Sequence, residues 1–166
     1  QAKLTQTSSP LGEWLDHFSD VFNGAIVVYL GFKCLHLPLD VRFIVLTWLN
    51  FLAFAVTYVE QRVRQELYFG KIGSLEGVVL MIFLLALCIP ESGRAFWHLE
   101  FYWPIYQFLL ASFALGCFGT IFTCLRRMRA LPREFLVFSI GGSLLVVLGI
   151  YLNLSISLLV CTITIF

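Results

Sequence analysis

The chain has 166 residues, of which 60% are hydrophobic and only 13% are charged, and its formal net charge is +1. Soluble domains are nearer half apolar and a quarter charged, so this composition excludes an ordinary soluble domain and favours a membrane protein. A nearly neutral chain also argues against a nucleic-acid partner, because such partners require basic surfaces.

Long stretches without charge predict helices that cross a membrane. A crossing helix needs about 20 mostly apolar residues, and a helix satisfies its backbone polar groups without water. The uncharged stretches are residues 43–59, 77–90, 105–125 and 135–166. Residues 21–35 join them when Lys33 extends from the helix end toward the headgroups.

In chain order, the sequence predicts five full spans and a truncated sixth. The first covers about 11–35 after a Ser-Ser-Pro start, the second 41–64, and the third 75–89, ended by Pro90. The fourth runs from about Pro104 to the basic cluster at 126–129, with Gly116-Cys117-Phe118-Gly119 as an expected site of close helix approach. The fifth begins after Pro132. A single helix over 135–166 would be about 48 Å long, so we expect a break near Asn153 and a final piece too short to cross. The expected fold is an all-α polytopic transmembrane bundle, a single domain over residues 1–166 cut at both ends.

Basic residues orient the spans, because cytoplasmic loops carry an excess of lysine and arginine. Of the 11 basic residues, eight fall on the side where the first span begins: Lys3, Arg62, Arg64, Lys71, Arg126, Arg127, Arg129 and Arg133. The other three fall on the opposite side: Lys33, Arg42 and Arg94. The first side is therefore predicted to be cytoplasmic. The opposite loop carries Trp97, Tyr102 and Trp103, which are expected to form an interfacial aromatic belt.

Two aspartates in the first span carry the chemistry. Asp16 and Asp20 are four residues apart and share one helix face, and Gly12 leaves space one turn earlier. A carboxylate inside a membrane helix costs about 2.5–3.5 kcal/mol, and two cost more unless a cation lies between them. Such oxygen ligands suit Mg²⁺. The alternative is a solvated first turn outside the lipid, and the spacing alone leaves both interpretations open.

Residues 2–20 resemble the CDP-alcohol phosphotransferase signature, D-x2-D-G-x2-A-R-x8-G-x3-D-x3-D. Ala2, Lys3, Gly12, Asp16 and Asp20 stand at the pattern's positions with every gap preserved. Two departures matter. The first two aspartates of the signature would precede residue 1, so the domain would be partial and the chain alone is expected to be inactive. Lysine also replaces the usual arginine, which keeps the charge but loses bidentate phosphate geometry.

A weaker similarity extends to the eukaryotic choline- and ethanolaminephosphotransferase branch. It rests on residues 8–13, on Asp16 and His17, and on residues 67–70 followed by Glu76 and Gly77. The resemblance implies transfer of phosphoethanolamine or phosphocholine from a CDP-alcohol to diacylglycerol with release of CMP. It also implies a two-metal site that uses Mg²⁺ or Mn²⁺ and is partly supplied by residues upstream of this chain.

By the same resemblance, Asp16 is a metal ligand and Asp20 is the general base that also touches metal. Lys3 binds phosphate and Gly12 admits the nucleotide of the CDP-alcohol. His17 and Glu76 are weaker candidates. His17 lies about 100° from the aspartate face, and a core or interface position is favoured over a role in the site. Glu76 fits a solvated helix start equally well.

Three alternatives remain in view. In the first, the chain belongs to the same family but uses another alcohol, such as inositol or glycerol phosphate. In the second, it is a non-catalytic truncated membrane subunit. The third, a transporter or channel, is disfavoured because it needs polar residues along a pathway across the membrane, and the fourth and fifth spans lack charge. The expected partners are CDP-alcohol, diacylglycerol and membrane lipid, with a homodimer left open. The expected location is the endoplasmic reticulum or Golgi, as a multi-pass protein with its active site facing the cytoplasm.

Overall fold

A computed structural model describes residues 10–64, 83–84, 86–100, 102–128 and 132–152. These residues are helical, with no strand among them beyond an isolated bridge between Glu100 and Pro104. The helices are α1 (Pro10–Cys34), α2 (Val41–Arg64), α4 (Glu91–Trp97), α5 (Ile105–Arg127) and α6 (Arg133–Tyr151). The predicted all-helical class is confirmed for this part of the chain. The bounds of α1, α2, α5 and α6 agree closely with four of the predicted spans.

The number of membrane spans is supported only in part. By length and composition, α2 and α5 are able to cross a membrane, whereas the apolar parts of α1 and α6, Phe22–Cys34 and Phe135–Tyr151, are shorter. Most of the predicted third span and the piece beyond Asn153 lie outside the described residues. The segment between Pro90 and Pro104, expected to be a loop, contains α4. The described helices thus support two spans rather than the five expected.

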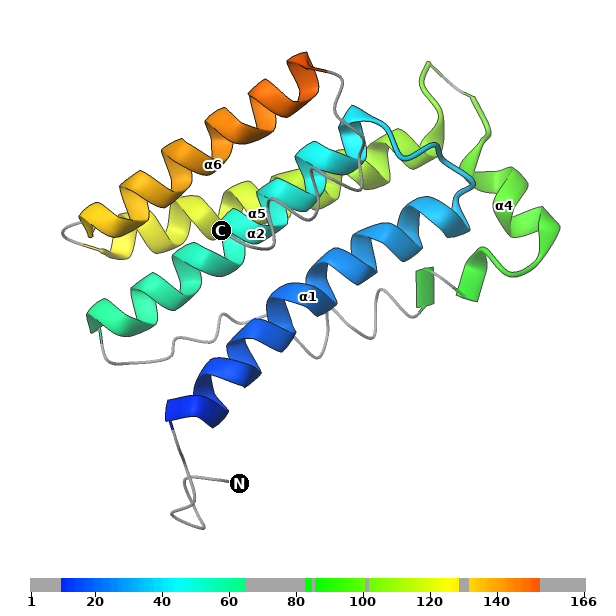
Figure 1. Cartoon of the computed structure of the whole chain (residues 1–166). Helices are drawn as coiled ribbons and strands as arrows, with labels where there is room; N and C mark the ends of the chain where they lie inside the picture. Colours follow the sequence, from blue (N-terminus) through cyan, green and yellow to red (C-terminus); the bar gives the residue numbers. More distant parts are fainter. Residues whose placement is uncertain (1–9, 65–82, 85, 101, 129–131, 153–166) are drawn as a thin grey trace, which may run out of the picture.

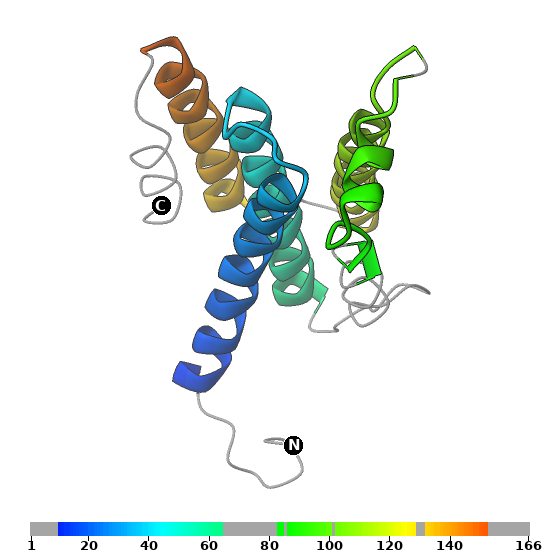
Figure 2. The same cartoon turned by 90° about the vertical axis from the view of Figure 1, so that its right-hand side faces the viewer.

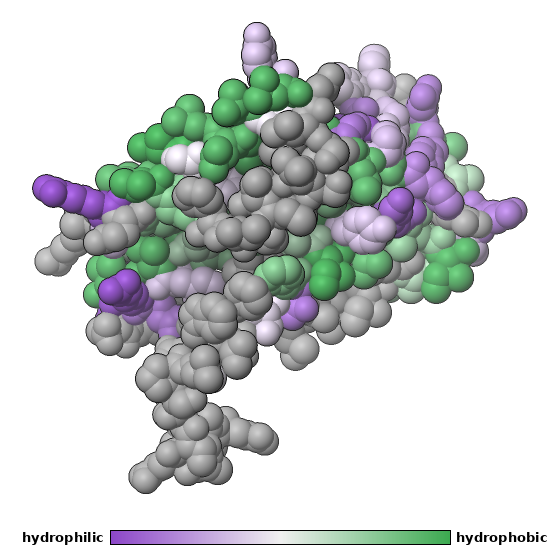
Figure 3. All heavy atoms as spheres, in the orientation of Figure 1, coloured by the Kyte–Doolittle hydropathy of each residue, from purple (hydrophilic) through white to green (hydrophobic). Residues whose placement is uncertain are grey.

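Around α2, the helix α5 runs in the same direction, whereas α1 and α6 run in the opposite direction (Figure 1). We call the end of the bundle where α1 and α6 begin the near end; α2 and α5 finish there. We call the opposite end, where α2 and α5 begin and α1 finishes, the far end. The arginines Arg62, Arg64, Arg126, Arg127 and Arg133 therefore gather at the near end, while Lys33 and Arg42 lie at the far end. Figure 3 shows polar side chains concentrated at the two ends, with hydrophobic surface between them. This grouping matches the basic asymmetry read from the sequence, while its orientation toward the cytoplasm stays a prediction.

The first contact layer joins α1 to α2. Ala25, Val28 and Phe32 recur at helical spacing along α1 and, with Leu35 just beyond its end, pack toward α2. The ring of Phe32, which is 1% exposed, meets Phe43 edge to face with centroids 5.4 Å apart.

The helices cross where α1 carries a glycine. A Cβ on Gly24 would lie 2.9 Å from the Phe54 ring and would overlap the side-chain amide of Asn50. Any larger residue at position 24 would therefore push α1 away from α2.

The second layer joins α2 to α5 through small residues. Ala53 and Cys117 are both buried at this contact with Leu49, and small side chains let two helices approach closely. The predicted site of close approach at residues 116–119 is confirmed in part, through Cys117 and not through Gly116 or Gly119. Both glycines are exposed, and a Cβ on either would meet nothing within 4 Å. Close approach instead uses Cys117, about 100° around α5 from Gly116.

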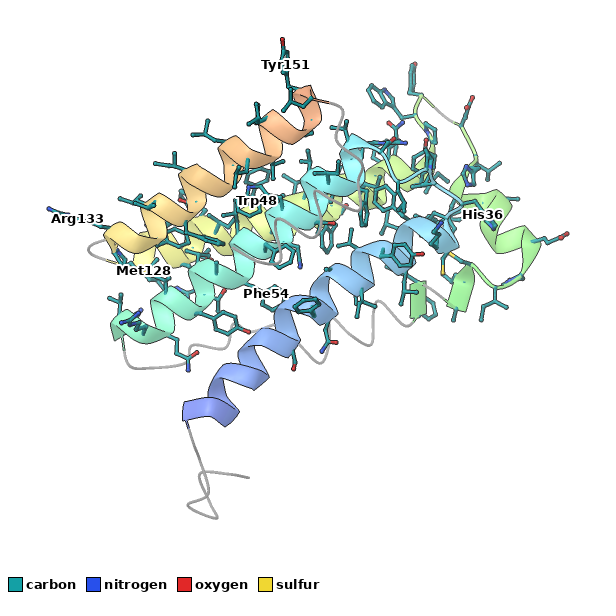
Figure 4. The ribbon with its side chains drawn as sticks, viewed as in Figure 1. His36, Trp48, Phe54, Met128, Arg133 and Tyr151 are labelled. Atoms are coloured by element: carbon teal, nitrogen blue, oxygen red, sulfur yellow. The ribbon has the colours of Figure 1, made fainter. Side chains whose placement is uncertain are left out.

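The third layer sets α6 on α2 through Trp48, whose side chain points from α2 toward α6 (Figure 4). The indole Nε1 donates a hydrogen bond to Ser143 Oγ at 3.1 Å. Gly142 lies directly against the ring, because a Cβ there would be 2.6 Å from Cζ2 and would overlap Cη2. A tryptophan on one helix and a glycine on the other fix the α2–α6 contact.

Asp40 defines the far-end start of α2. Its Oδ1 accepts a hydrogen bond from the Arg42 backbone N–H at 2.9 Å, and its Oδ2 accepts from Arg42 Nη2 at 2.7 Å. The side-chain hydrogen bond from Arg42 holds the pKa of the Asp40 carboxyl below its usual value. A charged pair thus marks the point where the chain leaves the loop and enters the apolar helix.

Candidate functional site

The candidate site lies on the N-terminal half of α1. The helix is continuous from Pro10 through Asp16 and Asp20, so these two positions stand one turn apart on the same side of α1. Figure 2 shows α1 crossing α2 with its N-terminal end standing apart from the other helices. Among the side chains that the structure describes, packing against α2 is seen from Gly24 onward, while Gly12 and Ser19 are exposed. These two residues of the signature half are therefore accessible.

The structure describes some of the predicted site residues fully, some by their backbone only, and some not at all. Gly12 is an exposed helical residue, and its role beside the nucleotide stays a prediction. Asp16, His17 and Asp20 are placed in α1 by their backbone, while their side chains lie outside the described part. Lys3 and Glu76 also lie outside the described residues, as do the segment at 67–70 and the Ser8 and Ser9 cap.

The metal-binding role of the aspartate pair stays a prediction that rests on its spacing in the sequence. Two carboxylates one turn apart on a continuous helix provide oxygen ligands of the kind that Mg²⁺ takes from proteins, commonly one or two carboxylates with substrate phosphates. Among the described side chains, no group of three or more His, Cys, Asp or Glu comes together to hold a metal. Further ligands for a two-metal site would have to come from elsewhere.

The structure also contains a buried carboxylate that the sequence analysis missed. Glu60, in the last turns of α2, is only 4% exposed. Its Oε1 lies 3.4 Å from Arg127 Nη1 of α5 and 3.7 Å from Arg64 Nη1, one turn along α2. These ion pairs tie the near ends of α2 and α5 together beside buried Cys124. The i,i+4 spacing of Glu60 and Arg64 was a usable signal, but the pairing with Arg127 depends on helix packing.

The aromatic residues of the far end separate into buried and exposed ones. Trp97 was predicted to belong to an interfacial belt, and this is wrong: it is 7% exposed and packs into the main hydrophobic cluster. It belongs to α4, whose other side faces outward. Tyr102 and Trp103 are 100% and 62% exposed, as an interfacial position requires.

Comparison with known proteins gives a partial similarity to a fungal protein. The chain is 36% identical over 99 residues to an uncharacterized CDP-alcohol phosphatidyltransferase class-I family protein of Schizosaccharomyces pombe. The match covers 58% of this chain and 25% of the relative, so the chain spans about a quarter of that relative's length. No family model matches the chain, and no solved structure matches it. The similarity supports the CDP-alcohol phosphotransferase family and its general kind of reaction, without distinguishing a branch, an alcohol or an acceptor.

Proposed function

We propose that this chain carries the second half of a metal-dependent active site that transfers phosphoethanolamine or phosphocholine from a CDP-alcohol to diacylglycerol. The observation that carries the proposal is the match of residues 2–20 to the signature, with Gly12, Asp16 and Asp20 on one uninterrupted helix. The fungal relative supports the same family. The choice of aminoalcohol rests on the weaker similarity around residues 67–77.

Each residue has a distinct task in this proposal. Asp16 holds a divalent ion, and Asp20 accepts the proton of the diacylglycerol hydroxyl as that oxygen attacks the phosphorus bearing the alcohol. Lys3 pairs with a phosphate oxygen, and Gly12 leaves room for the nucleotide. Divalent ions, when bound, supply charge neutralisation on the attacking and leaving oxygens. CMP departs as the new phosphodiester forms.

The position of the site in the molecule agrees with this reaction. The signature half of α1 lies at the near end, where Arg62, Arg64, Arg126 and Arg127 also lie. Basic residues attract phosphate-bearing molecules, and arginine-rich ends of membrane helices face the cytoplasm. A water-soluble CDP-alcohol and a lipid hydroxyl would therefore meet at the cytoplasmic membrane surface of the endoplasmic reticulum or Golgi.

The experiment measures CMP release against Mg²⁺ and Mn²⁺ concentration for Asp16→Asn and Asp20→Asn. The chain used carries Asp-x-x-Asp-Gly-x ahead of residue 1. Asp16→Asn removes a charge from the metal site, so part of its activity should return at high metal concentration. Asp20→Asn removes the proton acceptor, and general-base catalysis contributes about 10²–10⁴-fold. Added metal should not restore that variant, although it should still bind CDP-alcohol.

A matched control uses Asp40→Asn, which removes a carboxylate from the far end of the bundle. This variant should keep normal turnover and normal metal dependence. Near-normal turnover in both Asp16→Asn and Asp20→Asn would show that these aspartates form an ordinary solvated helix start, and the proposal would fail. The same assay with CDP-choline, CDP-ethanolamine, inositol and glycerol phosphate separates the branches of the family.

A further inference from the structure

The far end carries an ordered segment with apolar side chains turned outward. It comprises the described residues between 89 and 103, including α4, and is named the far-end strap here (Figure 1). Its large exposed side chains are Ile89 (77%), Phe96 (49%), Leu99 (52%), Tyr102 (100%) and Trp103 (62%). Exposed Glu91, His98 and Glu100 alternate with them. Apolar and charged side chains thus share one outward surface.

Specific contacts hold the strap in place. His98 Nε2 donates a hydrogen bond to the Leu35 carbonyl at 2.9 Å, just beyond the end of α1. The Ile105 N–H donates to the Leu99 carbonyl at 3.2 Å, which closes the turn into α5. Trp97 is buried against the bundle on the inner side. The outward side chains therefore belong to a fixed surface rather than to a free loop.

The position of the strap along the bundle axis, relative to the length of α5, indicates which layer of a membrane it would meet. With 23 residues, α5 is about 34 Å long at 1.5 Å per residue, close to the ~30 Å thickness of the hydrocarbon layer. Trp103 lies two residues before α5 begins, and the charged pair of Asp40 and Arg42 lies at the same end. This is the level at which hydrocarbon gives way to headgroups. Tryptophan and tyrosine prefer that level because one side of each ring is apolar and its polar group reaches water.

We propose that the far-end strap is seated in the headgroup layer of the leaflet opposite the near end, as a lipid-binding anchor of the bundle. Phe96, Leu99 and Trp103 enter the upper acyl region, while Glu91, His98 and Glu100 stay among the headgroups. The hydrogen bond from His98 then fixes the far end of α1, the helix that carries Asp16 and Asp20, relative to the membrane surface. This inference rests on membrane insertion of α5 but not on the catalytic roles proposed above.

The test measures Trp103 fluorescence in phosphatidylcholine vesicles containing brominated acyl chains. The Trp103 signal is taken as the difference between the unmodified protein and Trp103→Phe, so that the packed tryptophans stay in place. Bromine near the carbonyl end of the chain should quench it more than bromine near the methyl end, and aqueous iodide should quench it weakly. The matched control is Trp97→Phe, whose difference signal should be insensitive to both lipids because Trp97 is buried.

A depth reference separates failure of this inference from failure of membrane insertion. Leu115 is 70% exposed and lies ten residues into α5, about 15 Å from its start. The tryptophan introduced by Leu115→Trp should be quenched most by bromine near the methyl end. Suppose that this tryptophan is quenched by bromine while Trp103 is quenched by iodide and by neither brominated lipid. The strap then faces water or a protein, and the inference is wrong. If neither tryptophan senses bromine, α5 does not span the bilayer and the strap has no membrane to enter.

Discussion

Gly142 offers the sharpest test of helix packing, because its neighbour Gly141 serves as a matched control. An ideal Cβ on Gly142 would lie 2.6 Å from Trp48 Cζ2 and 3.0 Å from Cζ3, and would overlap Cη2. A Cβ on Gly141 would meet nothing within 4 Å. The two variants Gly142→Ala and Gly141→Ala therefore add the same methyl group to the same helix turn with opposite consequences.

The magnitude follows from these distances. Carbon atoms pack at about 3.5–4.0 Å, so Gly142→Ala must move α6 or the indole ring by more than about 1 Å. Overpacking of this kind costs about 1–3 kcal/mol, and turning the ring also strains the Trp48–Ser143 hydrogen bond, worth about 1 kcal/mol. Gly141→Ala should instead stabilise the helix by up to about 1 kcal/mol through helix propensity. The variants are expected to differ by about 2–4 kcal/mol.

The measurement is the free energy of unfolding of each variant in mixed micelles, followed by circular dichroism as the fraction of denaturing detergent rises. Tryptophan emission is recorded in the same samples, and because the chain has four tryptophans both variants are compared with the unmodified chain. Gly142→Ala should unfold earlier than Gly141→Ala and should be the variant whose emission changes. Equal stability of the two variants would refute the close packing of α6 on Trp48.

Three further predictions test other contacts. Gly24→Ala should destabilise the bundle relative to Gly31→Ala, because only the first added methyl group meets α2; equal melting would contradict the crossing of α1 and α2 there. Glu60→Ala should cost about 1–3 kcal/mol, since it removes a buried acceptor that holds the partly exposed Arg127 and Arg64, whereas Glu100→Ala at an exposed position should cost less; similar values would argue against the ion-pair cluster. In sealed vesicles, a cysteine introduced by Arg126→Cys should be labelled from the cytoplasmic side and one introduced by Glu91→Cys from the opposite side. Labelling of both from one side would overturn the orientation.

The helices themselves were readable from the sequence because their signals are local. Pro10, Pro104 and Pro132 precede or begin helices, and the uncharged runs between polar ends set their lengths. These features fix α1, α2, α5 and α6 without reference to any neighbour. The short helix α4 escaped prediction because seven residues provide too little periodicity.

Packing was less readable because it depends on which face each helix presents. The glycines at 116 and 119 marked a plausible contact face, but α5 is rotated so that Cys117 meets α2. The burial of Glu60 likewise requires the end of α5 to lie beside it. Pattern reasoning identified the aspartate pair at 16 and 20 because the signature has fixed spacing within one helix. The remaining ligands that the signature implies lie outside that helix, so local spacing alone does not supply them.

The central claim is that this chain supplies one half of a CDP-alcohol phosphotransferase site. The most direct measurement is CMP release from CDP-ethanolamine and diacylglycerol in detergent with Mg²⁺ or Mn²⁺. It compares the 166-residue chain with the same chain preceded by Asp-x-x-Asp-Gly-x. We predict no release by the chain alone and metal-dependent release by the extended chain. Robust release by the chain alone would contradict the need for upstream aspartates, and no release by a folded extended chain at any metal concentration would contradict the enzymatic role.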